Sequence, residues 1–155
     1  MQSFYDWYLP RALKETSSPA WEQAIKYKPN VFDGPLRTAL KADLAAQAKA
    51  KDEIVGLDFD PFLNSQDPQG KYKVVKVEEK GLKMFATVRC VVNGNTTPHP
   101  IIQVEIYHGR EGWLLTNFIA DNESLLHILA VQAKKRGDPP PRKRPVGPKN
   151  SFGGI

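Results

Sequence analysis

Apolar and polar positions follow two different periods along this chain, and the period changes near residue 70. Before that point apolar residues recur every three or four positions, which is the spacing of an amphipathic helix. From Lys71 to Ala120 they alternate with polar residues, as in half-buried strands. Helical spacing then returns. We therefore predict one α+β domain over residues 1–136, in which N-terminal helices pack on a curved, four-stranded antiparallel sheet and a C-terminal helix follows.

Four segments predict helices, and proline or small polar residues mark their ends. Pro10 is expected to kink or end the first helix, because proline lacks the amide hydrogen of the helical ladder. Ser18 is the expected cap of the second helix, and Asp121 and Asn122 are the expected caps of the last. The predicted helices run from about Ser3 to Pro10, from Pro19 to Pro29, from Pro35 to about Lys51, and from Glu123 to about Arg136.

Short turn sequences separate the four predicted strands, so the sheet is expected to be an antiparallel meander with one face covered by the helices. Asn93 and Gly94, followed by Pro98 and Pro100, predict a longer loop between the second strand and the third. The predicted strands are Lys71–Glu79, Lys83–Val92, Ile101–His108 and Trp113–Ala120.

The stretch from Leu57 to Asp67 joins the helical half to the strand half, and it combines apolar residues with carboxylates. Asp60 before Pro61 is typical of a helix or turn start, where the carboxylate accepts free amide hydrogens. We expect Asp60 and Asp67 both to accept such hydrogens. Alternate oxygen-bearing residues from Asp58 also suggest a calcium loop, but the glycine and glutamate that such a loop needs are absent, so no calcium site is predicted.

A small-ligand pocket is the main alternative to a purely structural role for this connector. If Trp113 and Asn117 face inward on the last strand, they form an apolar wall with one amide beside the connector, which is a usual pocket lining. A buried carboxylate there can have a raised pKa and act as a general base. The competing interpretation is a filled core with Trp113 as its plug. The candidate ligand-binding residues are Asp58, Asp60, Gln66, Asp67, Trp113 and Asn117.

Charge is distributed unevenly along the 155 residues, although the net charge is +5. Residues 134–155 carry seven Lys or Arg and one Asp, whereas residues 1–133 sum to −1. A neutral body argues against nucleic-acid binding by the domain. Residues 137–155 form a basic, proline- and glycine-rich tail that cannot build a core and that can contact an acidic surface. No apolar run is long enough to span a membrane.

Other residue types add few chemical candidates. His99, His108 and His127 lack the spacing of metal ligands, and the single cysteine, Cys90, lies on an apolar strand face as a buried thiol would. The sequence contains no nucleophile elbow and no phosphate-binding loop. We predict no metal, no cofactor and no catalytic residue, and we favour a protein without enzymatic activity over an enzyme.

Several of these segments together resemble the bacterial family catalogued as domain of unknown function 3828. The resemblance covers roughly residues 3–133. It is most specific at Asp60-Pro61-Phe62-Leu63 with Gln66-Asp67. The other matching segments are Phe4-Tyr5-Asp6-Trp7-Tyr8, the Leu40/Leu44 helix, Gly112-Trp113 and Ser124-Leu125-Leu126. The family is similar to the nuclear-transport-factor-like (cystatin-like) cone, in which helices cup a curved sheet. It implies no settled activity.

The resemblance implies an exported, periplasmic protein from which a signal segment was removed, and a cytoplasmic protein is the other possibility. We expect a binding module that takes a small ligand or a protein partner at the mouth of the cone. Two alternatives stay open: an inhibitor or immunity-type protein that blocks a partner enzyme, and a small hydrolase- or isomerase-like enzyme that uses a carboxylate of the cone. A homodimer is a further possibility.

Overall fold

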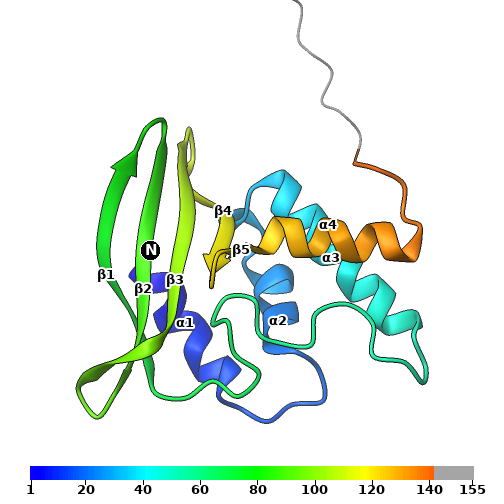
Figure 1. Ribbon diagram of the computed structural model, residues 1–155, viewed down its shortest axis with the longest axis horizontal. Coiled ribbons are helices and arrows are strands. Elements are labelled where there is room, and N and C mark those ends of the chain that lie inside the picture. Colours follow the sequence, from blue (N-terminus) through cyan, green and yellow to red (C-terminus); the bar gives the residue numbers. More distant parts are fainter. Residues whose placement is uncertain (142–155) are drawn as a thin grey trace, which may run out of the picture.

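The helices and strands follow one another in the predicted order, and the helices lie to one side of the sheet (Figure 1). The computed structural model describes residues 1–141. Its helices are α1 (Gln2–Ala12), α2 (Ala20–Tyr27), the short 3-10 helix η1 (Pro29–Val31), α3 (Gly34–Lys49) and α4 (Leu125–Arg136). Its strands are β1 (Lys71–Lys80), β2 (Lys83–Val92), β3 (Asn95–Gly109), β4 (Gly112–Ala120) and β5 (Glu123–Ser124). The predicted α+β class is confirmed.

The sheet is an antiparallel meander in the order β1-β2-β3-β4-β5, one strand more than the four predicted. The added strand is the two-residue β5, which pairs with the end of β4. The predicted loop after Asn93 is wrong, because Asn93 and Gly94 both have positive φ and form a two-residue hairpin turn. Val92 therefore pairs with Asn95, and β3 begins six residues before the predicted Ile101.

The predicted ends of three helices differ from the structure. α1 runs through Pro10 to Ala12, because a proline near the last turn removes little of the helical ladder. α4 begins at Leu125, after Ser124, whose hydroxyl accepts the amide hydrogen of His127 at 3.4 Å, so the expected caps Asp121 and Asn122 are wrong. α2 has no side-chain cap, so the expected cap by Ser18 is also wrong.

An aromatic cluster forms the centre of the core, and Phe62 of the connector lies in its middle. The ring of Phe62 packs against those of Phe4, Tyr8, Phe32 and Phe118 at centroid distances of 5.6, 5.2, 5.3 and 5.0 Å. These rings come from α1, the end of η1 and β4, so one connector residue links the helices to the sheet. Full burial of such a ring stabilises the fold by about 1.5–3 kcal/mol.

A buried carboxylate joins α3 to the end of α4. Asp43 is fully buried, and its oxygens accept hydrogens from the Gln47 amide at 2.8 Å and the Leu57 backbone amide at 3.0 Å. Arg136 of α4 forms an ion pair with it at 3.2 Å. Gly56 has a φ of +80° and approaches so closely that an added Cβ would lie 2.5 Å from an Asp43 oxygen. The loop after α3 is thereby fixed at the start of the connector.

β1 forms one edge of the sheet, and a side chain of α1 covers part of it. Gln2 donates to the carbonyl of Tyr72 at 3.2 Å and accepts the amide hydrogen of Val74 at 2.8 Å. The register between β1 and β2 then shifts between Val74 and Lys76, which indicates a bulge. Part of this edge is therefore occupied or distorted, as is common for exposed edge strands.

Candidate functional site

The connector makes a tight turn around Asp60. Its Oδ1 accepts the amide hydrogens of Phe62 at 3.0 Å and Leu63 at 3.1 Å, and its backbone amide donates to the Ser65 carbonyl at 2.8 Å. Asn64 completes the reversal with a φ of 47°. The prediction that Asp60 caps this segment is confirmed.

The second oxygen of Asp60 accepts the hydroxyl hydrogen of Tyr8 at 2.5 Å. Burial raises the pKa of the Asp60 carboxyl from its ordinary 3.8 to about 6, although the hydrogen bonds from Tyr8, Phe62 and Leu63 act in the opposite direction. Burial and the neighbouring Asp60 also raise the pKa of Tyr8, so its phenol keeps its proton. A carboxylate has about four acceptor positions, of which three are filled here.

A cleft of about 340 Å³ lies beside this carboxyl, between the α1–α2 linker and the connector. Its volume is near the lower end of the range for small-molecule sites. Four ionisable side chains line it, three of them acidic: Lys14, Glu15, Asp58 and Asp60. The remaining walls are hydroxyl-bearing, amide or apolar residues, namely Ala12, Thr16, Ser18, Pro19, Ala20, Trp21, Leu57, Phe59, Ser65, Gln66 and Pro68.

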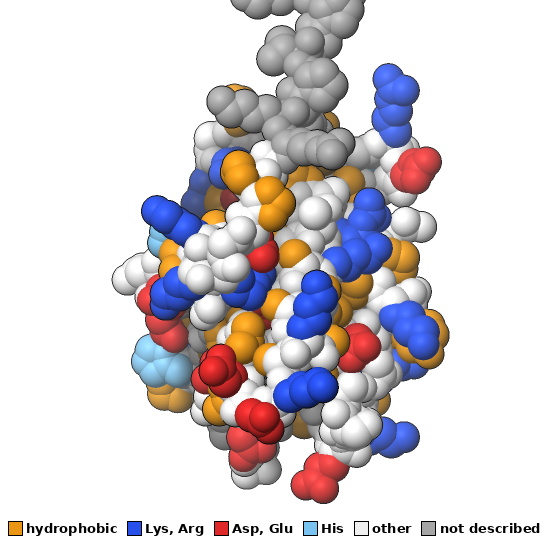
Figure 2. All heavy atoms as spheres, turned by 90° about the vertical axis from the view of Figure 1, so that its right-hand side faces the viewer, with side chains coloured by type: hydrophobic (Ala, Val, Ile, Leu, Met, Phe, Trp, Pro, Cys, Tyr) orange, Lys and Arg blue, Asp and Glu red, His pale blue; other side chains and the backbone are white. Residues whose placement is uncertain are grey.

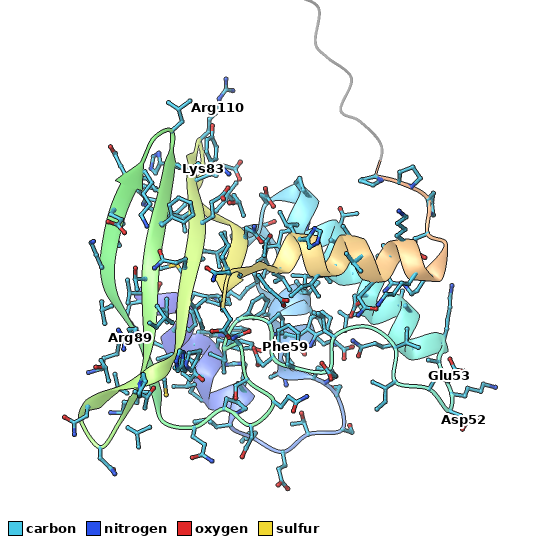
Figure 3. The ribbon with its side chains drawn as sticks, in the orientation of Figure 1. Asp52, Glu53, Phe59, Lys83, Arg89 and Arg110 are labelled. Atoms are coloured by element: carbon cyan, nitrogen blue, oxygen red, sulfur yellow. The ribbon has the colours of Figure 1, made fainter. Side chains whose placement is uncertain are left out.

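Three of the six candidate residues therefore lie together in the cleft. Besides Asp60, these are Asp58 and Gln66, which are exposed and joined by a hydrogen bond of 3.3 Å from the Gln66 amide to the Asp58 carboxylate. Phe59, which follows Asp58 along the chain, lies on the connector between the sheet and the helices (Figure 3). Phe59 also lines a second, smaller cavity of about 110 Å³ that reaches Phe118 and α4.

Asp67 lies outside the cleft and does not cap a turn. Its exposed carboxylate accepts only a side-chain hydrogen, from Gln69 at 3.3 Å, while its backbone amide donates to the Ser65 hydroxyl at 3.1 Å. The expectation that Asp67 accepts a backbone amide is wrong, because Pro68 directs the chain away before a turn can close on the carboxylate.

Trp113 and Asn117 do not form a wall of the cleft, and the expectation that Trp113 plugs the core is wrong. Trp113 is 48% exposed and packs edge-on against His108 near the end of the β3–β4 hairpin. Asn117 is buried and structural: its oxygen accepts the amide hydrogens of Phe118 and Leu126, and its nitrogen donates to Ser124. A register shift between β3 and β4 beside Asn117 breaks the simple alternation on which the prediction depended.

The opposite wall of the cleft was not predicted. It comes from the α1–α2 linker, where Lys14, Glu15, Thr16 and Ser18 lie. The signal in the sequence was a run of polar and turn-forming residues between two helices, which marks a loop but not its packing partner.

Other candidate chemistry stays separate from the cleft. Cys90 is buried, as predicted, and its thiol contacts the Gln69 carbonyl at 3.1 Å. Within residues 1–141, no group of three or more His, Cys, Asp or Glu side chains is arranged to hold a metal ion. None of the helices in this range combines the length and apolar character needed to cross a membrane.

No family model, no curated protein and no solved structure matches the chain. The resemblance to domain of unknown function 3828 and to the nuclear-transport-factor-like cone therefore stays a prediction. What is established is the class: an α+β domain with a carboxylate-lined cleft beside its central connector.

Proposed function

We propose that this protein is a binding module that takes a small polar ligand in the cleft beside Asp60. The observation that carries the proposal is the Asp60 carboxyl itself, which lines the cleft and is held by hydrogen bonds from Tyr8, Phe62 and Leu63. The turn and Tyr8 fix this carboxyl before any ligand arrives. Such preorganisation favours binding, because less side-chain freedom is lost on association.

The charges of the cleft define the ligand class. One lysine faces three carboxyl groups, so the lining is net acidic when all three are ionised. Hydroxyl and amide groups of Thr16, Ser18, Ser65 and Gln66 add further hydrogen-bond partners. We expect a ligand the size of a metabolite that carries amine or hydroxyl donors, and we expect anionic compounds to bind less well.

The proposal is tested by titrating the protein with four probes, a diamine, a hexose, a nucleoside and a dicarboxylic acid, while backbone amide shifts are followed by NMR. The expected result is that the diamine or the hexose shifts amides in residues 14–20 and 57–68, whereas the dicarboxylic acid does not. The double variant Asp58→Asn/Gln66→Ala should weaken this binding about tenfold, since it removes two exposed groups of the cleft.

The chain provides a matched control. Asp67 and Gln69 form the same kind of exposed pair at the same distance of 3.3 Å, but neither lines the cleft. Asp67→Asn/Gln69→Ala should leave binding unchanged. The proposal is refuted if both double variants weaken binding equally, if the shifts map elsewhere, or if none of the four probes binds.

A second candidate is an enzyme in which Asp60 acts as a general base. The raised pKa of about 6 supports it, because a base works best when its pKa is near the working pH. His108 packs on Trp113, and Asp58 pairs with Gln66, so neither of them is a partner of Asp60 in the structure. Turnover that is lost in Asp60→Asn and kept in Asp67→Asn would favour the enzyme over the binding module.

An exported location belongs to the same proposal, with the family resemblance as its support. Fractionation of cells that express the gene from its own start would test it. Recovery with periplasmic markers is expected, and recovery with cytoplasmic markers would refute it.

A further inference from the structure

The face of the sheet opposite the helices concentrates positive charge. Strand register places six basic side chains on this face: Lys71, Lys73, Lys76, Lys80, Lys83 and Arg89. Of the carboxylates on the described strands, two share it, Glu78 and Glu105. The face therefore carries +4, although residues 1–133 together sum to −1, so the remainder of that range carries −5. On the helical side, by contrast, side chains of both signs are interspersed (Figure 2).

The two carboxylates lie toward the same end of the face and neutralise the cations there. Glu78 pairs with Lys76 at 2.7 Å and Lys80 at 3.1 Å, and Glu105 pairs with Lys83 at 3.1 Å. Arg89 lies toward the opposite end of the sheet from Lys83 (Figure 3). The charge excess is thus concentrated at the Arg89 end.

At that end, Lys71, Lys73 and Arg89 form a group that we call the cationic cluster. None of them has a carboxylate partner among residues 1–141. Lys73 lies directly opposite Arg89 in the β1–β2 register, so the Cβ atoms of these two like-charged residues are about 5 Å apart. Such a cross-strand pair is unfavourable. An acidic group placed over the pair would convert this repulsion into attraction.

The surroundings of the cluster suit a polypeptide. Arg89 is held in place by donating to the Thr97 carbonyl at 2.9 Å, and its register partner Ile101 is 38% exposed. A carboxylate and a neighbouring apolar side chain would thus both find a contact. Single-stranded nucleic acid binds best where its bases can stack on a ring beside the basic groups. The two rings of this face, Phe85 and the exposed Tyr107, lie at its carboxylate end and not beside the cluster.

We propose that the cationic cluster is the docking site for an acidic segment of a partner protein. The segment lies on the face of the sheet and does not extend its edge, because Gln2 already occupies the edge groups of Tyr72 and Val74. This surface is separate from the cleft beside Asp60, so either proposal can fail alone.

The test uses a fluorescein-labelled peptide of ten glutamates with an apolar residue at its centre, and fluorescence anisotropy at about 0.1 M salt, where a Debye length is about 10 Å. Lys73→Gln/Arg89→Gln should weaken binding about fivefold, since it removes two exposed ion pairs of about 0.5 kcal/mol each. The control Lys76→Gln/Lys80→Gln changes the net charge equally on the same face and should weaken binding less than twofold. Lys71→Gln/Lys73→Gln, which alters only exposed lysines, repeats the test if the first variant does not fold.

Three results would overturn the proposal. One is equal weakening by the cluster variants and the control. Another is no binding of the peptide by the full chain. The last is tighter binding of a ten-residue oligothymidylate than of the glutamate peptide, which would assign the face to nucleic acid.

Discussion

Replacing Asp60 by asparagine should change how the stability of the protein depends on pH. Asparagine keeps the Oδ1 that accepts the amide hydrogens of Phe62 and Leu63, but it cannot ionise. In the native state the pKa of Asp60 is raised from 3.8 to about 6. The folded protein therefore binds the proton more tightly than the unfolded chain does.

The sign and the size follow from this difference. The stability associated with the protonated carboxyl is fully present below pH 3.8 and is lost as the pH rises through about 6. The difference between the two pKa values corresponds to about 3 kcal/mol. Wild type should thus lose about 3 kcal/mol relative to Asp60→Asn between about pH 4 and pH 7, and the difference should be constant above that.

Urea unfolding at five pH values from 4 to 8 measures this difference directly. Asp67→Asn, which removes an exposed carboxylate of the same connector, records the general effect of losing one charge and is subtracted. Profiles for wild type and Asp60→Asn that run parallel within about 0.5 kcal/mol would show that burial does not hold the Asp60 proton. A wild type that gains stability relative to the variant as the pH rises would reverse the sign.

The other predictions concern Asp60 and Asp43 and their neighbours. Tyr8→Phe removes the hydroxyl that donates to Asp60, so it should raise the pKa of Asp60 above 6. In the same unfolding series it should lower the free energy of unfolding by about 1.5–3 kcal/mol at pH 8 and by less at pH 4. Arg136→Gln leaves Asp43 buried without its ion-pair partner and should lower the free energy of unfolding by about 3 kcal/mol. In a double-mutant cycle, adding Asp43→Asn should recover part of this loss, and additive effects of the two changes would contradict the pairing. Gly56→Ala should lower the melting temperature strongly, because its Cβ would overlap the Asp43 carboxylate; a melt equal to wild type would disprove this close approach.

The order of the elements could be predicted from sequence because each has a strong local signal. Period-two alternation identified Lys83–Val92 in full, since Ala86, Val88 and Cys90 face the core on one side of β2. The turn at Asn93 was predicted incorrectly, because Pro98 and Pro100 suggested a longer loop although Asn-Gly is itself a hairpin signal. Short-range patterns thus determine which elements form better than they determine where each one ends.

Three of the six candidate ligand-binding residues line the cleft and three do not, and the difference has a physical cause. Asp60 could be recognised because its role is local: its carboxylate accepts the amide hydrogens of residues two and three positions further along the chain. Trp113 shares the face of Leu115 but is exposed because it lies at the hairpin end of β4, and a register shift after Leu115 removes Asn117 from that face. The linker wall could not be predicted, since its contact with the connector joins segments about forty residues apart and depends on tertiary packing.

The position of Gln2 has a consequence for self-association of the chain. A glutamine side chain occupies the hydrogen-bonding groups of Tyr72 and Val74 that another strand would otherwise use. This protection lasts only while α1 stays docked, since the glutamine belongs to the helix and not to the sheet. Fraying of the first helical turn would turn β1 into a template for intermolecular strand pairing. The tendency of this protein to aggregate should therefore follow the local stability of α1 and not the global stability of the fold.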